Sequence, residues 1–194
     1  MVESKTFLIS DLHLWHSNII RYCNRPFSGV QEMSNRLIQN WNDAIKPEDR
    51  VFFLGDFAFG TRDTVIKSGQ RLNGRKVFIY GNHDKYKPQV YYDAGFEHVS
   101  RWPIVIQNKY LLSHAPFRID GNQIYPGPLI NIHGHVHDKL EYAPTISSRS
   151  ACVCVERWDY KPVELTVIKK MIEVSKGRDI DEEEIGLECL QRRL

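Results

Sequence analysis

The sequence has no long hydrophobic run, no excess of one charge and no C-x-x-C pair. A membrane span needs about 18 consecutive apolar residues, and the apolar stretch at residues 6–10 reaches Asp11 too soon to be the core of a signal peptide. With 26 Lys and Arg against 24 Asp and Glu, the formal net charge is only +2, which favours neither a long nucleic acid nor an anionic membrane as partner. These absences predict a cytoplasmic protein with no membrane partner.

The four cysteines are too irregularly spaced for a disulfide framework, and they indicate reduced thiols. Cys152 and Cys154 alternate with valines in a run at residues 151–156 that is typical of a strand, so both thiols are expected on one face. Two thiols at this spacing are able to ligate a metal, but a buried structural pair is the favoured interpretation.

The chain is long enough for one packed domain and short for two, with 194 residues of which 42% are hydrophobic. No repeat, low-complexity segment or linker divides it. We expect one domain over residues 1–175. A C-terminal tail follows at residues 176–194, which has an acidic run at 179–184 and is expected to be a short solvated helix or else a frayed end.

Short apolar runs predict strands that are buried on both faces. The expected strands are residues 6–10, 51–54, 76–80, 96–99, 103–107, 110–113, 129–132 and 151–156. Helical spacing of apolar residues predicts helices at 34–45, 61–72 and 165–174, with Thr61 as an N-cap and Gly74 just beyond the end of the second. Alternating strands and helices predict an α/β fold.

Seven of the eight histidines lie in four short segments, and each segment directly follows an expected strand. In α/β sheets the ligand site lies beyond the carboxyl ends of the strands. A fifth strand ends at Gly55-Asp56 without a histidine. One pocket could therefore gather all five polar clusters.

Two carboxylates, one amide oxygen and four imidazoles in these clusters could ligate metal. They belong to Asp11, His13, Asp56, Asn82, His114, His135 and His137. Seven ligands are too many for one structural zinc, and they suit two divalent transition-metal ions. We expect manganese first, with iron, zinc, cobalt or nickel as alternatives. Two such ions about 3.5–4 Å apart would clamp a phosphate ester, and His83 could be the acid that protonates the leaving group.

The order of these motifs resembles that of the calcineurin-like metallophosphoesterases. The motifs are Asp11-x-His13, Gly55-Asp56, Gly81-Asn82-His83-Asp84, His114 and Gly134-His135-x-His137. Each is weak alone, but five in order, each after a strand, make a strong signal. Residues 11–20 also look like the small bacterial and phage members. The resemblance implies a four-layer α/β sandwich of two mixed β-sheets flanked by helices.

The resemblance also implies a role for each motif residue. It implies Asp11, His13 and His137 on a first ion, Asn82, His114 and His135 on a second, and Asp56 bridging the two. His83 is expected near the phosphate as general acid or charge stabiliser, and a hydroxide between the ions is expected to be the nucleophile.

One motif departs from the family pattern. Many superfamily phosphatases continue G-D-x-x-D-R, which supplies an acid that orients the catalytic histidine and an arginine for phosphate. Here the stretch from Gly55 to Gly60 has neither group, which argues against a protein serine/threonine phosphatase. The orienting partner of His83 stays open, with Asp84 only a sequence neighbour. The candidate phosphate-binding groups are Arg118, His16, Arg21 and Arg25, and substrate contacts are expected at His16 and Arg118.

Several residues near the motifs allow a structural interpretation. His133 is expected to be structural and His98 to be a surface histidine, while His16 could equally belong to a solvated loop. Aromatic residues around the first two motifs could stack on a nucleobase or cap the core. They are Trp15, Tyr22, Phe27, Phe57 and Phe59.

The expected function is a metal-dependent phosphoesterase that acts on a small or exposed phosphate ester. A phosphodiester is slightly favoured over a monoester, because no arginine pair for a dianionic phosphate is evident. A nuclease acting on nucleic-acid ends is one alternative, although the near-neutral charge opposes tight binding of long duplexes. A catalytically silent metal-binding scaffold is the other. The sequence leaves the oligomeric state open.

Overall fold

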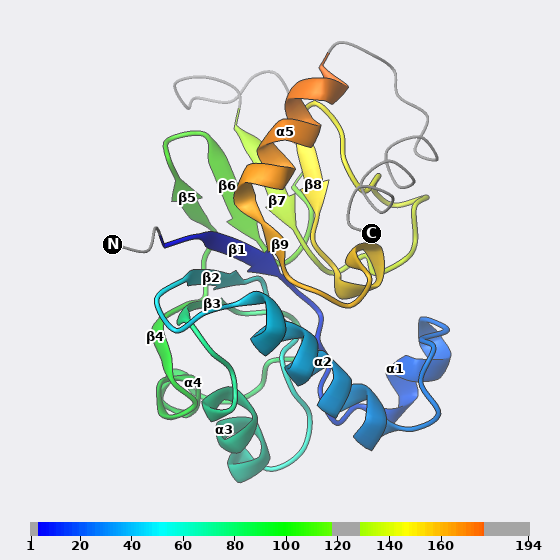
Figure 1. Cartoon of the computed structure of the whole chain (residues 1–194), viewed down its shortest axis with the longest axis vertical. Coiled ribbons are helices and arrows are strands. Elements are labelled where there is room, and N and C mark those ends of the chain that lie inside the picture. The colour runs from blue at the N-terminus through cyan, green and yellow to red at the C-terminus, as the bar shows by residue number, and fades with distance from the viewer. Residues whose placement is uncertain (1–3, 118–128, 177–194) are drawn as a thin grey trace.

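Two mixed β-sheets form the centre of the computed structural model, which describes residues 4–117 and 129–176 (Figure 1). The five-stranded sheet has the order β4-β3-β2-β1-β9, and the four-stranded sheet has the order β5-β6-β7-β8. The strands of the first sheet are β1 (Thr6–Ile9), β2 (Arg50–Phe53), β3 (Arg75–Ile79), β4 (Phe96–Ser100) and β9 (Val163–Glu164). Those of the second are β5 (Ile104–Ile106), β6 (Tyr110–Ser113), β7 (Ile130–His133) and β8 (Ser150–Cys152).

The strands that precede the motifs run parallel within each sheet. β1, β2 and β3 are parallel neighbours, and so are β6 and β7. Among the strands of the described residues, only β9 and β5 run antiparallel to their neighbours. The carboxyl ends of β1, β2 and β3 therefore meet at one edge of the first sheet, and those of β6 and β7 meet at one edge of the second.

Five helices and one 3₁₀ helix accompany these strands in the described part of the chain. They are α1 (Ser17–Tyr22), α2 (Val30–Ala44), α3 (Arg62–Gln70), α4 (Pro88–Asp93), α5 (Leu165–Ser175) and η1 (Val155–Trp158). Helices α2, α3 and α4 lie on one side of the five-stranded sheet, and the four-stranded sheet lies on the other (Figure 1). The predicted α/β fold of two mixed sheets flanked by helices is confirmed.

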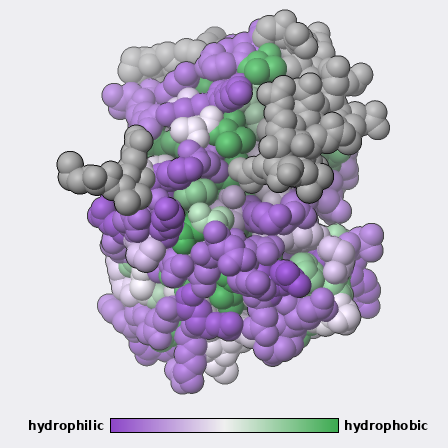
Figure 2. All heavy atoms as spheres, in the orientation of Figure 1, coloured by the Kyte–Doolittle hydropathy of each residue, from purple (hydrophilic) through white to green (hydrophobic). Residues whose placement is uncertain are grey.

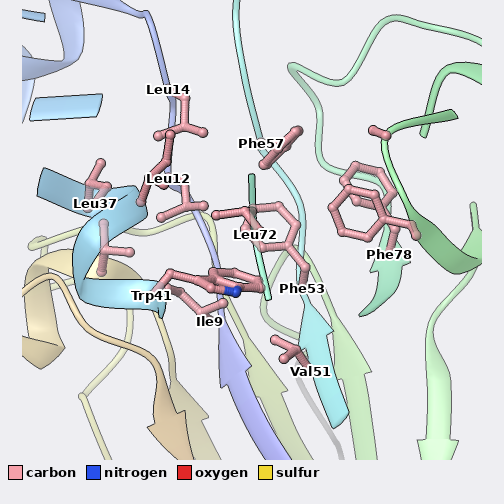
Figure 3. Packing of buried hydrophobic residues seen from close by; sticks show 14 of the residues in the cluster. Ile9, Leu12, Leu14, Leu37, Trp41, Val51, Phe53, Phe57, Leu72 and Phe78 are labelled. Carbon is pink, nitrogen blue, oxygen red and sulfur yellow. The ribbon is translucent and has the colours of Figure 1, made fainter. Parts of the chain in front are cut away.

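The five-stranded sheet is buried on both faces because consecutive strand residues point to opposite sides. Phe7 and Ile9 of β1 pack in the core under the helices, whereas Leu8 packs in the core shared with the second sheet and α5. Figure 3 shows the helix-side core, where Trp41 of α2 lies near Phe53 of β2 with ring centroids 6.2 Å apart. This two-sided burial explains the near-continuous apolar runs of the strand sequences.

Most predicted elements are present with small shifts at their ends. The third predicted helix, at 165–174, corresponds to α5, and Thr61 caps α3 as predicted by accepting a hydrogen bond from the Thr64 N–H. The helix predicted from residue 34 begins earlier, at Val30, because Ser34 is not a cap but a buried helix residue whose hydroxyl accepts the Trp15 N–H. Helices α1 and α4 and the short strand β9 were not predicted.

The strand predicted at 151–156 is wrong in its second half. β8 ends at Cys152, and the 3₁₀ helix η1 follows because the Arg157 N–H donates to the Cys154 carbonyl and closes a turn. Cys152 and Cys154 are nevertheless both buried free thiols, with their sulfurs 3.4 Å apart. Of the predicted tail at 176–194, everything after Lys176 lies outside the described residues.

The face drawn in Figure 2 is covered mainly by hydrophilic residues, with hydrophobic residues visible between them. Among the described residues, no helix is both long enough and apolar enough to cross a membrane.

Replacing Trp41 with alanine tests the helix-side core. Trp41 is fully buried, and its indole N–H donates to the Asn73 carbonyl at 3.0 Å. We expect Trp41→Ala to lower the free energy of unfolding by about 3–5 kcal/mol, since a large cavity and an unpaired carbonyl are left behind. Urea unfolding measures this. Trp102→Ala is the control, because that side chain is 77% exposed and its loss should change stability by no more than about 0.5 kcal/mol.

Candidate metal centre

The polar motifs of both sheets converge where the carboxyl ends of the parallel strands face each other. Asp11 follows β1, Asp56 follows β2 and Asn82 follows β3, while His114 follows β6 and His135 follows β7. Backbone hydrogen bonds join these loops: the Asp11 N–H donates to the Gly55 carbonyl, and the Gly134 N–H donates to the His114 carbonyl. The carboxylate of Asp11 then accepts the His135 N–H at 2.9 Å, which connects the two sheets.

One group of side chains surrounds the Asp11 carboxylate. Its Oδ1 atom lies 3.8 Å from Nε2 of His13 and 3.7 Å from Nε2 of His137. Ligand atoms of Asp11, His13 and His137 all lie within 4.8 Å of one another, close enough to hold one metal ion. These are the three residues that the resemblance assigns to the first ion.

A second group surrounds the side-chain oxygen of Asn82. This Oδ1 atom lies 2.8 Å from Nε2 of His114 and 3.0 Å from Nδ1 of His135. The two imidazole nitrogens are 3.1 Å apart. The structure thus brings together the three residues that the resemblance assigns to the second ion.

Asp56 lies between the two groups. Its Oδ2 atom is 3.4 Å from Nε2 of His13 and 3.5 Å from Nε2 of His114. Burial raises the pKa of Asp56, but the neighbouring imidazoles of His13 and His114 outweigh it and lower the pKa to about 2. Asp56 is therefore an anion positioned to contact a cation on either side.

Unsatisfied buried atoms in this cluster fit a metal ion. Oδ1 of Asp11 and both ring nitrogens of His13 are buried without a hydrogen-bond partner. Buried polar groups are ordinarily paired, since leaving one unpaired costs about 1–3 kcal/mol. Both side chains are almost completely inaccessible, at 0% and 1% exposure. A cation between the two residues would satisfy Oδ1 of Asp11 and Nε2 of His13, which lie 3.8 Å apart.

The backbone of the candidate ligands is strained. Asp11, His13, Asp56, His135 and His137 all have positive φ angles, between 49° and 73°. Residues other than glycine seldom adopt this left-handed conformation, and such strain clusters at functional sites. Five of the seven candidate ligands share it, which is typical of loops shaped for a site rather than for the stability of the fold.

Two glycines allow the motif loops to approach each other. A Cβ atom on Gly81 would lie 2.2 Å from Oδ1 of Asp56, and one on Gly134 would lie 2.4 Å from Oδ2 of Asp11. Neither distance is compatible with a side chain. These glycines are therefore required by close packing against the two carboxylates, in addition to any role in turns.

A hydrogen bond on the side of the ring away from the cluster fixes the orientation of the His114 imidazole. Its Nδ1 atom lies 2.8 Å from the Leu54 carbonyl, which can only accept a hydrogen bond, so Nδ1 carries the proton. The lone pair of Nε2 then points at Asn82 and Asp56. This arrangement, with one ring nitrogen bound to a carbonyl and the other free, is the usual one for a metal-ligating histidine.

His137 is held in the same way by Glu156. Nδ1 of His137 lies 2.9 Å from Oε1 of Glu156, and that oxygen also accepts two hydrogen bonds from Arg25. Burial lowers the pKa of His137, but hydrogen bonds with Cys23 and Glu156 and the charge of Asp11 raise it to about 11. The negative charges of Asp11 and Glu156, which favour a proton on the His137 ring, would equally favour a metal cation at Nε2.

Arg25 is thereby removed from the candidates for phosphate binding. It is 3% exposed, and besides Glu156 it donates to the backbone carbonyls of Asp11 and Leu12. Its guanidinium is therefore used inside the protein. No local sequence pattern indicates this arrangement, because Arg25 and Glu156 are 131 residues apart.

Asp84 binds backbone groups rather than His83. Its carboxylate accepts the N–H groups of Asp56, Phe57 and Gly81 at 2.7, 3.0 and 2.8 Å. Through these bonds it fixes the loop after β2 to the loop after β3. Asp84 therefore supports the metal centre and does not orient the imidazole of His83.

His83 and His16 flank the cluster together with Phe59. The backbone N–H of His83 donates to Oδ1 of Asp56, and its exposed ring lies 5.4 Å from that of His13. The ring of Phe59 stacks on His16 at 3.9 Å and lies 5.5 Å from His83. Burial and the charges of His13 and His83 lower the pKa of His16 to about 4, so His16 is neutral at pH 7 and would contact a substrate only as a hydrogen-bonding group.

A family model for calcineurin-like phosphoesterases matches residues 4–142, well over half of the chain. The chain belongs to the calcineurin-like phosphoesterase family. Membership supports a metal-dependent phosphoester hydrolase in general terms, and it agrees with the metal-competent groups of side chains in the structure.

Relatives of this phosphoesterase occur in archaea, bacteria and phages. The chain is 41% identical to the uncharacterized protein MJ1445 of Methanocaldococcus jannaschii, over 91% of this chain and 96% of that protein. It is 27% identical to the Gene 66 protein of Mycobacterium phage D29, with 87% and 96% covered. A solved protein of unknown function, AQ665 from Aquifex aeolicus, is similar with a TM-score of 0.67 and 28% identity, covering 88% of this chain and 100% of that one.

The remaining predicted residues of the phosphoesterase lie apart from the metal centre or outside the described residues. Arg118 lies outside them. Arg21 is exposed, 5.6 Å from the Tyr22 ring. His133 is buried and hydrogen-bonds the Gly134 carbonyl and Ser150, which agrees with a structural role, and His98 is exposed as expected.

Some of the aromatic residues near the first motifs belong to the core, and others lie where they could stack on a substrate. Phe57 is fully buried in the helix-side core, and Phe27 packs against that core. Trp15 is half-buried and donates its indole N–H to Ser68. Phe59 and the exposed Tyr22 are the two that lie beside His16.

Replacing Asp84 with asparagine tests its role between the two loops. An amide retains one accepting oxygen but turns an NH₂ group toward one of the backbone N–H donors. We expect Asp84→Asn to lower the free energy of unfolding by about 1–3 kcal/mol, the cost of an unpaired buried group. Urea unfolding of the metal-free protein is the measurement. The exposed Asp43, changed to asparagine, is the matched control, and equal stability of the two variants would contradict the proposed role.

Proposed function

We propose that this phosphoesterase hydrolyses phosphodiesters, in preference to monoesters, at a centre of two divalent transition-metal ions. The observation that carries the proposal is the convergence of six other metal-competent side chains around Asp56. One ion would be held by Asp11, His13 and His137, the other by Asn82, His114 and His135, with Asp56 bridging both. Imidazole with carboxylate ligands favours manganese, iron, zinc, cobalt or nickel over calcium, and manganese is our first choice.

When bound, the two ions would supply Lewis acidity for the phosphate and activate the attacking nucleophile. The protein's own residues hold the ligand set rigid, because His114 and His137 are fixed by Leu54 and Glu156. His83 has an exposed ring beside the cluster, where it can give a proton to the leaving oxygen. No covalent intermediate with a protein side chain is needed.

Preference for a diester follows from the cations near the site. The family's arginine for phosphate is replaced by Gly60, Arg25 is buried against Glu156, and His16 is neutral at pH 7. A phosphate diester carries one negative charge and a monoester up to two, so a site with few cations besides the metals discriminates against the monoester. His16 stays a proposed substrate contact, and so does Arg118.

A nuclease and a catalytically silent scaffold are the two alternative functions, and they make different demands on the residues of the site. A nuclease acting on nucleic-acid ends would use the same centre and would add stacking on aromatic side chains such as Phe59 or Tyr22. A silent scaffold would require missing ligands or a missing catalytic histidine, whereas the full ligand set and His83 are present here. The phosphoesterase is therefore the stronger proposal.

Replacing Asp56 with asparagine tests the binuclear centre. We expect the wild type with added manganese to hydrolyse bis-p-nitrophenyl phosphate faster than p-nitrophenyl phosphate. Asp56→Asn should lose both ions and the diesterase activity, because the bridging charge is gone. Elemental analysis by mass spectrometry gives the metal content, and Asp43→Asn is the control. A variant that retains two tight ions would remove Asp56 from the bridging position.

Replacing His83 with alanine tests proton transfer to the leaving group. We expect His83→Ala to retain both metals and to lose about 10²–10⁴ in kcat with a poor leaving group. The loss should be much smaller with p-nitrophenolate, which leaves without protonation. If both esters slowed equally, His83 would act on the phosphate itself and not as a general acid.

A further inference from the structure

A cavity of about 170 Å³ lies beside the metal centre. It is lined by Ala58, Phe59, Gly60, His83, Lys85 and Tyr86. None of the seven candidate metal ligands is in this set, and His83 is the one residue that it shares with the proposed catalytic machinery. The cavity is therefore next to the reacting centre without being part of it.

Two aromatic rings form fixed walls of this cavity. The hydroxyl of Tyr86 donates to the Gly60 carbonyl at 2.6 Å, and the Tyr86 carbonyl accepts the hydroxyl of Tyr80 at 2.8 Å. Phe59 is held by its stacking on His16, with an interplanar angle of 11°. Walls that are already ordered lose little conformational entropy when a ligand binds.

The size and lining of the cavity suit one aromatic ring. Apolar cavities of about 150 Å³ bind benzene, so the volume of this cavity matches one six-membered ring better than a larger fused system. Lys85 is the one lysine or arginine in the lining, and it is exposed. Its ammonium could donate to an oxygen on the ring, such as a carbonyl or nitro group.

The position of His83 determines which part of a substrate would enter. The group that protonates a leaving oxygen must lie on the leaving-group side of the phosphate, opposite the attacking nucleophile. His83 lines the cavity. The cavity consequently adjoins the leaving group and not the part of the ester that stays on phosphorus.

We propose that the Phe59–Tyr86 cavity binds a single aromatic ring on the leaving-group side of the phosphodiester. This assignment rests on the proposed function and names its substrate class. The ring is that of an aryl ester or of a pyrimidine nucleoside, which share a planar six-membered ring with oxygen substituents. Phe59 and Tyr86 are then specificity-determining residues of the phosphoesterase.

Tyr86 offers a pair of variants that separates the ring from its hydroxyl. Tyr86→Leu removes the stacking surface, whereas Tyr86→Phe removes only the hydrogen bond to Gly60. Each protein is assayed with two methyl phosphodiesters whose leaving groups have equal acidity, one a phenol and the other an acyclic fluoroalcohol. We expect Tyr86→Leu to lower the ratio of the two kcat/KM values by roughly five-fold or more, as for loss of one aromatic stacking contact, and Tyr86→Phe to lower it much less, because the ring is retained.

A binding measurement makes the test independent of catalysis. Fluorine NMR follows the binding of 4-fluorophenol to wild type, Tyr86→Phe and Tyr86→Leu, and the last should bind several-fold more weakly. Equal binding to all three, or equal loss in both variants, overturns the assignment of the cavity. Absence of hydrolysis of every ester, together with Tyr86-dependent binding of the phenol, would refute the proposed function while retaining the aromatic site.

Dinucleotides distinguish the two sources of the ring. Faster cleavage of a pyrimidine dinucleotide than of a purine dinucleotide, with the difference lost in Tyr86→Leu, supports a nucleoside as the occupant. Cleavage of the aryl ester alone supports an aryl ester. A purine dinucleotide cleaved as well as the pyrimidine one, with no effect of Tyr86→Leu on either, would contradict a cavity limited to a single ring.

Discussion

The burial of two carboxylates between the two sheets is the constraint on which the rest of the site depends. Asp11 and Asp56 are 0% and 2% exposed, and a buried charge is tolerated only where it is hydrogen-bonded or paired. The backbone supplies part of this through the N–H groups of His135 and His83. The remaining oxygens face imidazoles rather than Lys or Arg side chains. A site arranged in this way is stable when a cation lies between the carboxylates and the imidazoles, which couples metal binding to folding.

Strain in the loops and support behind them are two consequences of that constraint. Five of the seven candidate ligands adopt left-handed backbone conformations, and Gly81 and Gly134 pack against the carboxylates with no room for a side chain. Strain of this kind persists only where several surrounding contacts hold the backbone in place. Asp84 supplies such contacts between the loops after β2 and β3. The Arg25–Glu156 pair supplies them for the Asp11 backbone and the His137 ring. The rigidity of the centre therefore comes from residues that never contact a metal.

The strands, and the meeting of the candidate ligands at the strand ends, were predictable from the sequence because both depend on local patterns. A strand buried on both faces is a run of apolar residues, and a ligand that follows it is a polar residue at the end of that run. The supporting residues were not predictable in this way. Arg25 resembled a phosphate-binding cation, and Glu156 was placed in a strand, since the contact between them depends on a 3₁₀ turn and a separation of 131 residues. The role of Asp84 was similarly not predictable, because it consists of hydrogen bonds that its carboxylate accepts from the backbone N–H groups of other loop residues.

The stretch after Asp56 shows how one departure from a family motif changes recognition. Where many relatives have an acid and an arginine, this chain has Phe59 and Gly60. Phe59 contacts the rings of His13, His16 and His83, so packing replaces hydrogen bonding in keeping these histidines in place. The same substitution removes a cation for the phosphate and leaves an aromatic wall beside His83. Under the function proposed above, selectivity would depend less on the charge of the phosphate and more on the group attached to the leaving oxygen, because the aromatic wall would lie on that side of the site.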